Sequence, residues 1–263
     1  MATLETYANK YSTIRMERRD GILQLTFHTD GGSLRWGLIP HGEFPDAFAD
    51  IARDRENRVV IMTGTGDEFS GVRATPATTS MPTRPTLETI DRIHWEGRAL
   101  LMNLLNIEVP VISAINGPAW RHGEIPLLSD IVLASETALF QDAPHFMSGI
   151  VPGDGAHIVW PHLLGANRGR YFLIMGQEIG AKEALQLGVV SEVVPAGKLM
   201  ERARQVARYI ADMPMLTRRY TRVALTQRLK RLMQEGLGYG LAVEALAAID
   251  QLPAAGRMKD AGR

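Results

Sequence analysis

Short apolar runs alternate with amphipathic segments through about residue 195. The runs VVIMTG (59–64) and PVISAING (110–117) end at glycine, as is typical of strands buried on both faces. Between them, residues 87–107 carry apolar side chains at helical spacing, which predicts a long amphipathic helix. Its predicted core stripe is Ile90, Ile93, Leu100, Leu101, Leu104 and Leu105. The alternation predicts an α/β fold with a mostly parallel sheet.

The remaining segments of this region fit the same alternation. Residues 14–27 predict a β-hairpin around Asp20-Gly21, a pair that suits a tight turn. Helices are predicted at 45–53 and 155–164, and a strand at 138–142. Segments 125–135 and 180–195 each predict a short helix followed by a strand. Residues 71–86 hold three prolines and many small polar residues, which predicts a long loop of functional type.

From Leu199 onward the pattern predicts only helices. Breaks are expected near Met213-Pro214 and at the glycines 236, 238 and 240. We therefore divide the chain into a core domain, 1–198, and a C-terminal helical region, 199–263, which covers the core or docks on another subunit. The basic run at 218–231 has the spacing of a solvated helix face or a subunit interface.

Composition and charge exclude several classes of protein. The chain has 263 residues, 45% apolar and 22% charged, with zero formal net charge and no cysteine. Zero net charge gives no global attraction to nucleic acid or to an anionic membrane, and no apolar run reaches the roughly 20 residues that cross a bilayer. The polar N-terminus lacks the apolar core of a secretory signal, so we expect a cytoplasmic protein.

Common cofactor and hydrolase motifs are missing. The TGTG at 63–66 has Phe69 where a dinucleotide fingerprint needs its third glycine. GxSxG, GxxxxGK[ST] and HExxH do not occur. The sequence therefore gives no support for a nucleotide or a zinc-hydrolase site.

Four polar residues remain as candidates for chemistry. His122, His145 and Asp154 follow predicted strands, and ligands of parallel sheets bind beyond the carboxyl ends of strands. Glu244 lies in the apolar stretch LAVEALAAID (241–250). Structural alternatives stay open: Asp154 as a helix N-cap, His145 as a loop residue, Glu244 on an exposed stripe. A metal site of His122, His145 and Asp154 is a rival, disfavoured because no pair has i, i+4 spacing.

Three motifs stand out: PVISAINGPA (110–119), SDIVLAS (129–135) and FQDAPHFMSGIVPGDGA (140–156). With the alternation around them, they resemble the crotonase (enoyl-CoA hydratase/isomerase) superfamily, and the likeness covers nearly the whole chain. The resemblance implies the ClpP/crotonase-like spiral of ββα units with a C-terminal helical region. Here Trp120-Arg121-His122-Gly123 stands where the family has a run of glycines, and His145 where hydratases have a glutamate. The oxyanion loop F-x-A-G-A-D reads FSGVR (69–73). These departures speak against hydration of a CoA thioester.

The sequence is more similar to the 6-oxocamphor hydrolase-type β-diketone hydrolases of that superfamily. SLRW (33–36), HGEIPLLSDIVLA (122–134) and the stretch 241–250 carry this likeness. It implies hydrolysis of a cyclic 1,3-diketone without metal or coenzyme: water attacks one carbonyl, and the bond to the shared carbon breaks in a retro-Claisen step. The stretches 37–46 and 70–90 differ from that group, so the natural diketone stays open.

The resemblance also suggests roles for residues. His145 is the expected base, because an imidazole suits proton transfer near neutral pH. Asp154 is expected to orient His145 by a hydrogen bond of roughly 2.6–3.2 Å, and Glu244 to hold the water or the same histidine. His122 and the indole N–H of Trp36 are expected to donate to the carbonyl oxygen.

Two alternatives belong to other functions. One is a CoA-dependent hydratase or isomerase with Glu124 as its acid/base carboxylate. The other is an inactive scaffold that keeps the fold and its assembly. By resemblance we expect a trimer or a dimer of trimers, with the helical region at the subunit contacts.

Overall fold

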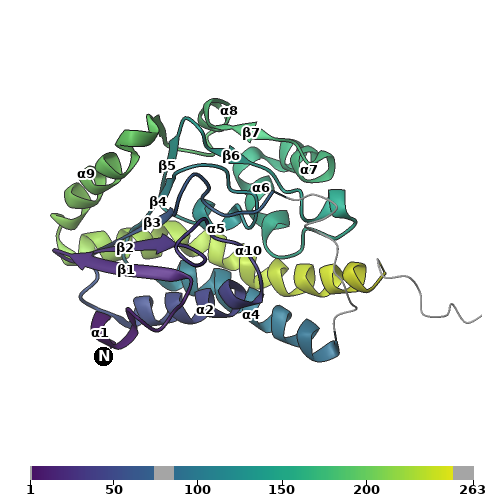
Figure 1. The fold of residues 1–263 in the computed structure, drawn as a ribbon, viewed down its shortest axis with the longest axis horizontal. Helices are drawn as coiled ribbons and strands as arrows, with labels where there is room; N and C mark the ends of the chain where they lie inside the picture. The colour runs from purple at the N-terminus through teal and green to yellow at the C-terminus, as the bar shows by residue number, and fades with distance from the viewer. Residues whose placement is uncertain (1, 74–85, 251–263) are drawn as a thin grey trace, which may run out of the picture.

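The structure is a computed structural model, and it describes residues 2–73 and 86–250. Its largest sheet has six strands in the order β1-β2-β3-β4-β5-β8 (Figure 1). In this sheet only the pair β1–β2 is antiparallel, and every other pair is parallel. This confirms the predicted α/β fold. The strands are β1 (Ile14–Arg19), β2 (Ile22–Phe27), β3 (Val59–Gly64), β4 (Val111–Ile115), β5 (Ile131–Ser135) and β8 (Glu192–Val194). A small second sheet pairs β6 (Leu139–Phe140) with β7 (Ile179–Gly180).

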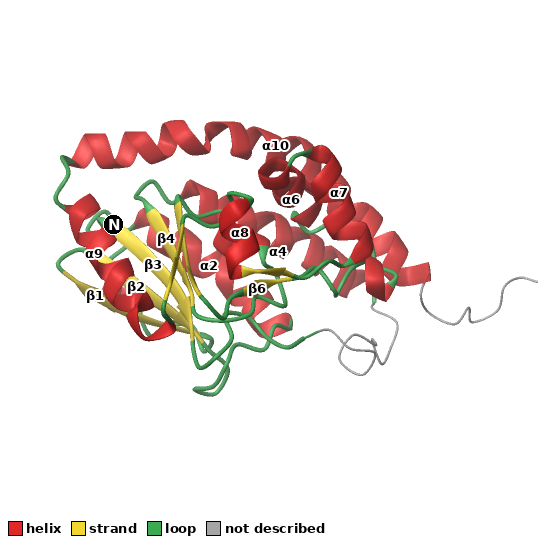
Figure 2. Ribbon diagram, turned by 90° about the horizontal axis from the view of Figure 1, so that it is seen from above, coloured by secondary structure: helices red, strands yellow, loops and turns green. Residues whose placement is uncertain are grey.

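Helices surround the large sheet, and the longest, α10, crosses the molecule in Figure 2. The α-helices are α1 (Leu4–Tyr7), α2 (Leu38–Arg53), α4 (Leu87–Asn106), α5 (Glu124–Leu127), α6 (Ala156–Leu164), α7 (Ala166–Met175), α8 (Ala181–Gln186), α9 (Leu199–Ala211) and α10 (Met215–Asp250). Two short 3-10 helices are η1 (Phe146–Ser148) and η2 (Ala196–Lys198). In the described parts of the chain, no helix is long and apolar enough to cross a membrane. The cytoplasmic location stays a prediction.

The hairpin forms where the sequence predicts it. Asp20 and Gly21 both have positive φ, 53° and 78°, as a tight two-residue turn between twisted strands requires. The turn joins β1 to β2 in full register from Ile14 opposite Phe27 to Arg19 opposite Ile22.

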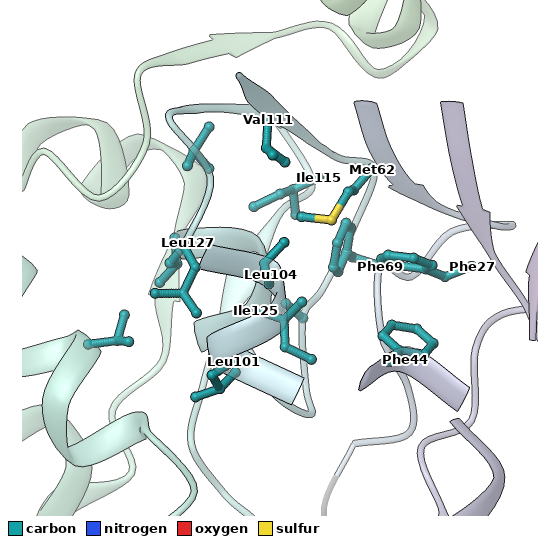
Figure 3. Close-up of a cluster of buried hydrophobic side chains, with 14 of the residues drawn as sticks. Phe27, Phe44, Met62, Phe69, Leu101, Leu104, Val111, Ile115, Ile125 and Leu127 are labelled. Atoms are coloured by element: carbon teal, nitrogen blue, oxygen red, sulfur yellow. The ribbon is translucent and has the colours of Figure 1, made fainter. Parts of the chain in front are cut away.

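The sheet is buried on both faces because neighbouring residues of its strands point in opposite directions. Val60 and Met62 of β3 belong to the main core, which α2 and α4 cover and Figure 3 shows. Val59 and Ile61 of β3 pack instead in a second core with α9. The α9 contribution is Leu199, Ala203, Ala207 and Ala211. The division into domains at residue 198 stays a prediction, and α9 packs directly on the sheet.

Helix α10 is continuous where breaks are predicted at its glycines. The break near Met213-Pro214 is confirmed, since α9 ends at Ala211 and α10 begins at Met215. The break at Gly236, Gly238 and Gly240 is wrong. A Cβ at Gly240 would lie 2.2 Å from His157 Cε1 and 2.3 Å from the Gly153 carbonyl oxygen. Glycine there permits close helix packing rather than ending a helix.

Other predicted elements differ in extent. Helix α2 begins at Leu38 rather than residue 45, and Pro40 fits its first turn, where backbone N–H groups have no intrahelical acceptor. In α4, Ile90 and Ile93 are only half-buried. The predicted strand at 138–142 is reduced to β6, and helix α7 was not predicted. The predicted loop at 71–86 is described only at residues 71–73 and 86.

Candidate active site

Loops that follow β4 and β6 meet helix α10 around one buried group of titratable side chains. His122 lies after β4, and His145 and Asp154 lie after β6. Glu244 reaches them from α10, much later in the chain. The structure therefore brings together His122, His145, Asp154 and Glu244, which the sequence analysis singled out separately.

Asp154 lies at the centre of this group. Its Oδ2 is 3.2 Å from His122 Nδ1 and 3.3 Å from His145 Nε2, so one carboxylate oxygen faces both imidazoles. Its Oδ1 accepts the Ala156 N–H at 3.3 Å. The N-cap of α6 is Gly155, one residue later than predicted, but the Asp154 side chain still contacts the start of the helix. Asp154 is thus fixed by the helix while facing the histidines.

His145 has a carboxylate at each ring nitrogen. The Asp142 Oδ1 is 2.6 Å from Nδ1, whereas Asp154 Oδ2 is 3.3 Å and Glu244 Oε1 is 3.8 Å from Nε2. The hydrogen bond predicted from Asp154 in the 2.6–3.2 Å range is therefore made by Asp142. Sequence analysis missed Asp142, although Asp-x-x-His across Pro144 was visible as a short spacing.

His122 has a backbone conformation that normally favours glycine. Its φ is 49°, in the left-handed region, where a histidine is uncommon and costs about 1–2 kcal/mol. This agrees with the family resemblance, in which a run of glycines is expected at this segment. Its Nδ1 hydrogen-bonds Glu124 at 2.6 Å, and its ring stacks against Trp36 with centroids 4.1 Å apart.

Trp36 is held between the imidazole of His122 and the core. Its ring also makes an edge contact with Phe44 of α2 at 5.2 Å between centroids. Another histidine, His41 of α2, has its ring centroid 6.3 Å from that of His122. It hydrogen-bonds Glu96 of α4 at 2.8 Å. The sequence analysis did not identify His41 or Glu96, because they are 55 residues apart and fit no motif.

The charges of this buried group control its histidines. Burial alone lowers the pKa of His145, but the Asp154 and Asp142 charges outweigh it and raise that pKa well above the ordinary 6.5. Burial likewise opposes the Glu124 and Asp154 charges at His122, and the pKa of His122 is raised. The neighbouring carboxylates therefore favour the protonated form of both imidazoles.

The carboxyl groups of this site differ in the direction in which their pKa values are shifted. Burial opposes ionisation of Asp154, but the His145 and His122 charges hold its pKa well below the usual range. Burial and the Asp154 charge raise the pKa of Glu244 to about 8, so Glu244 is mostly a neutral acid at pH 7. Its Oε2 is buried and has no hydrogen-bond partner among the described residues. Glu124 is fully buried, and burial together with Asp154 raises its pKa.

Glu244 also borders a small apolar pocket of about 60 Å³. The lining comes from α4, the loop after η1 and α10: Ile90, Ile93, His94, Ile150, Leu241, Glu244, Ala245 and Ala248. Its lining residues include no lysine or arginine among the parts of the chain that the structure describes. The half-buried Ile90 and Ile93, predicted as core, instead form one wall of this pocket.

Two overlapping groups have the spacing of cation ligands: His122, Glu124 and Asp154, and His145, Asp154 and Glu244. In both groups the histidine nitrogens face carboxylate oxygens at 2.6 to 3.8 Å, so hydrogen bonds and ion pairs account for the geometry. The structure also brings together His122, His145 and Asp154, the set that the sequence analysis considered as a rival metal site, through the same contacts. The expectation that no metal is needed stays a prediction.

Comparison with known proteins defines the class. The enoyl-CoA hydratase/isomerase family model matches residues 17–243, and the chain belongs to this family. A solved enoyl-CoA hydratase from Mycobacterium avium subsp. paratuberculosis K-10 shares the fold, with a TM-score of 0.77, 24% identity and 92% coverage of each chain.

A particular likeness is much stronger. The beta-diketone hydrolase from the cyanobacterium Anabaena sp. PCC 7120 is 53% identical, with a TM-score of 0.87, covering 93% of this chain and 97% of that one. A carnitinyl-CoA dehydratase from Shigella flexneri is 30% identical over 171 residues, 65% of this chain and 64% of that protein's length. The match thus spans under two thirds of that dehydratase.

Proposed function

We propose that this enzyme hydrolyses a carbon–carbon bond of a cyclic 1,3-diketone and releases a keto acid. The observation that carries the proposal is the buried group around Asp154. His145 Nε2 faces Asp154 and Glu244, and His122 Nδ1 faces the same oxygen of Asp154. The 53% identity to a beta-diketone hydrolase supports the same activity. The site residues proposed as catalytic are His145, Asp154 and Glu244, with His122 and Trp36 at the carbonyl oxygen.

The reaction needs one base and one place for negative charge. Because the surrounding carboxylates favour its protonated form, His145 acts as the base in the neutral fraction, which grows as pH rises. In that form Nε2 takes a proton from water as the water oxygen bonds to one carbonyl carbon. The bond from that carbon to the shared carbon then breaks, and its electron pair forms the enolate of the second carbonyl. The enolate carbon takes the proton back from His145, which leaves a carboxylic acid and a ketone. Asp154 stabilises the imidazolium formed between these steps.

Side chains rather than the backbone are proposed to stabilise the oxyanion. In the FSGVR loop, the Phe69 N–H donates to the Pro118 carbonyl at 2.9 Å and the Gly71 N–H to the Leu34 carbonyl at 2.8 Å. Those two donors are already satisfied. His122 donates Nδ1–H to Glu124, and in its protonated form Nε2–H is a second donor beside the Trp36 indole.

The pocket beside Glu244 has a lining that suits neutral hydrocarbon better than a phosphate-bearing thioester. Six of its lining residues are isoleucine, leucine or alanine. The Anabaena hydrolase was solved with (S)-3-oxocyclohexyl acetic acid, which carries a ketone and a carboxylic acid. Those are the two groups that hydrolysis of a cyclic 1,3-diketone leaves. We therefore propose bicyclic and monocyclic 1,3-diketones as the substrate class.

The test uses a panel of such diketones and follows the loss of enol absorbance. Wild type is expected to turn over at least one of them, and His145→Ala and Asp154→Asn to lose most of that activity. His162→Ala, a substitution of an exposed histidine in α6, is the matched control and should be as active as wild type. Equal activity in all four proteins would contradict the proposal, and an inert wild type would favour the inactive scaffold.

A CoA-thioester hydratase or isomerase is the second candidate, favoured by the family and by the dehydratase relatives. Its proposed acid/base, Glu124, is buried and hydrogen-bonded to His122. Turnover of an enoyl-CoA that Glu124→Gln abolishes and His145→Ala spares would replace the diketone proposal with this one.

For the assembly, we propose a trimer or a dimer of trimers that uses the C-terminal helices. Large apolar side chains are exposed along α9 and α10 of the single chain: Tyr209, Met215, Leu216, Tyr220, Leu225, Tyr239 and Leu246. Such surfaces mark protein contacts. Light scattering after gel filtration should give a mass near three or six chains, and a monomer would contradict this proposal.

A further inference from the structure

We infer that Asp142 is a positioning residue that holds His145 as the Nδ1–H tautomer, so that Nε2 is the nitrogen presented to the reactants. The inference deepens the proposed function by adding a residue to its site. It rests on the proposed hydrolysis only for its kinetic test.

The contact itself selects the tautomer. Asp142 Oδ1 is 2.6 Å from His145 Nδ1, and both side chains are buried. A carboxylate only accepts hydrogen bonds, so this distance requires a proton on Nδ1. When His145 is neutral, its lone pair is then at Nε2, the atom that faces Asp154 and Glu244.

The loop that carries the pair is fixed by its own hydrogen bonds. The His145 carbonyl accepts the N–H groups of Ser148 at 2.8 Å and Ile150 at 3.0 Å. The Ser148 hydroxyl donates to the Ala143 carbonyl at 2.9 Å, between the two partners. Gln141 donates from Nε2 to the Gly176 carbonyl at 2.9 Å. The pair is therefore preorganised before any substrate arrives.

The surrounding charges make the Asp142 contribution measurable. His145 is faced by Asp142 from its own loop, Asp154 from the loop before α6, Glu244 from α10 and the His122 ring through Asp154. The Asp142 charge also acts on Arg121, whose pKa burial lowers and Asp142 partly restores. Removal of the Asp142 charge leaves Asp154 as the main support of the His145 imidazolium, so the pKa of His145 should fall.

The first test needs no substrate. Nitrogen-15 NMR of histidine-labelled wild type, with His145→Ala to assign the signals, gives the tautomer and the titration midpoint of His145. We expect Nδ1–H in the neutral ring, and a midpoint that Asp142→Asn lowers by about 1–3 pH units. Asp91→Asn, at an exposed position of α4, is the control for loss of one negative charge and should leave the midpoint unchanged. An Nε2–H tautomer in wild type overturns the inference, whatever the variants do.

The second test is kinetic and uses a diketone that wild type hydrolyses. Asp142→Asn should lower kcat by about 10²-fold or more with little change in KM, because an amide can stabilise the wrong tautomer. The rise of kcat/KM with pH should move to lower pH in parallel with the NMR midpoint. Asp142→Glu, which restores the charge, should recover part of kcat. A variant with reduced thermal stability but an unmoved pH profile and NMR midpoint would show a merely structural role and overturn the inference. An inert wild type would instead count against the proposed hydrolysis and leave the NMR result to decide this one.

Discussion

Two regions of the molecule bury different kinds of side chain: the contact between α9 and the sheet, and the site beside α10. The buried part of the contact between α9 and the sheet is apolar, with Val59, Ile61 and Ile112 against small alanines. The group beneath α10 holds two histidines and four carboxylates: His122, His145, Glu124, Asp142, Asp154 and Glu244. One oxygen each of Asp142 and Glu244 is buried there with no hydrogen-bond partner in the part of the chain that the structure describes.

Burial of charge costs several kcal/mol per ion, and apolar replacements are often neutral or stabilising. The buried polar group is therefore expected to serve catalysis more than stability. The apolar contact of α9 is expected to serve stability and not catalysis. Substitutions on the two sides should separate activity from stability.

The largest effect is expected at His145. His145→Ala should reduce kcat by about 10³-fold, because general base catalysis contributes roughly 10²–10⁴-fold. Some loss of stability is also expected, because Asp142 and Asp154 lose the imidazole between them, so kcat is taken per folded molecule. Initial rates with a diketone substrate and a melting curve on the same sample check both, and a protein that melts much earlier with full activity per folded molecule would reverse the comparison.

A smaller loss is expected at Trp36. Trp36→Phe keeps a ring against His122 and removes the indole N–H, so kcat should fall about 10²-fold if that group stabilises the oxyanion. Trp95→Phe, at an exposed tryptophan of α4, should leave kcat unchanged. Equal rates for Trp36→Phe and wild type would remove Trp36 from the proposed donors.

On the α9 side, Ala207→Leu should act on stability alone. The added side chain overpacks a fully buried contact, which costs about 1–3 kcal/mol. The melting midpoint should drop by several degrees while kcat per folded molecule is kept. Gln205→Leu, at an exposed position on the same helix, is the control and should melt like wild type.

The smallest effect concerns pH. The pKa of Glu244 is raised from 4.5 to about 8 in the folded chain, so its favourable contribution is complete below about pH 4.5 and is lost as pH rises through 8. Glu244→Gln cannot ionise, so its stability relative to wild type should increase between acid and alkaline pH, by at most about 1.4 kcal/mol per pH unit. Denaturant titrations at several pH values measure this, and a constant difference would show that Glu244 ionises normally.

Periodicity predicted the elements that depend on local apolar patterns. The hairpin at Asp20-Gly21, the buried strands and helix α4 follow from side-chain spacing alone. Gly240 misled the prediction of α10, because the close approach of Gly153 and His157 that needs a glycine is made by residues far away in sequence.

The site was less accessible to sequence reasoning. Spacing left His145 and Asp154 open to structural explanations, and resemblance to a family suggested their roles. Asp142 and the His41–Glu96 pair carried no motif, since an orienting carboxylate is defined by its distance to a ring nitrogen. The half-buried Ile90 and Ile93 look like core in the sequence, because a pocket wall and a core use the same apolar residues.

The most direct measurement of the central claim is hydrolysis of a bicyclic 1,3-diketone in water enriched in oxygen-18, with mass spectrometry of the product. The proposed mechanism predicts a keto acid with one heavy oxygen in its new carboxylate group, formed by wild type and His162→Ala but not by His145→Ala. Intact diketone in wild type, or the same labelled product at the same rate from His145→Ala, would contradict it.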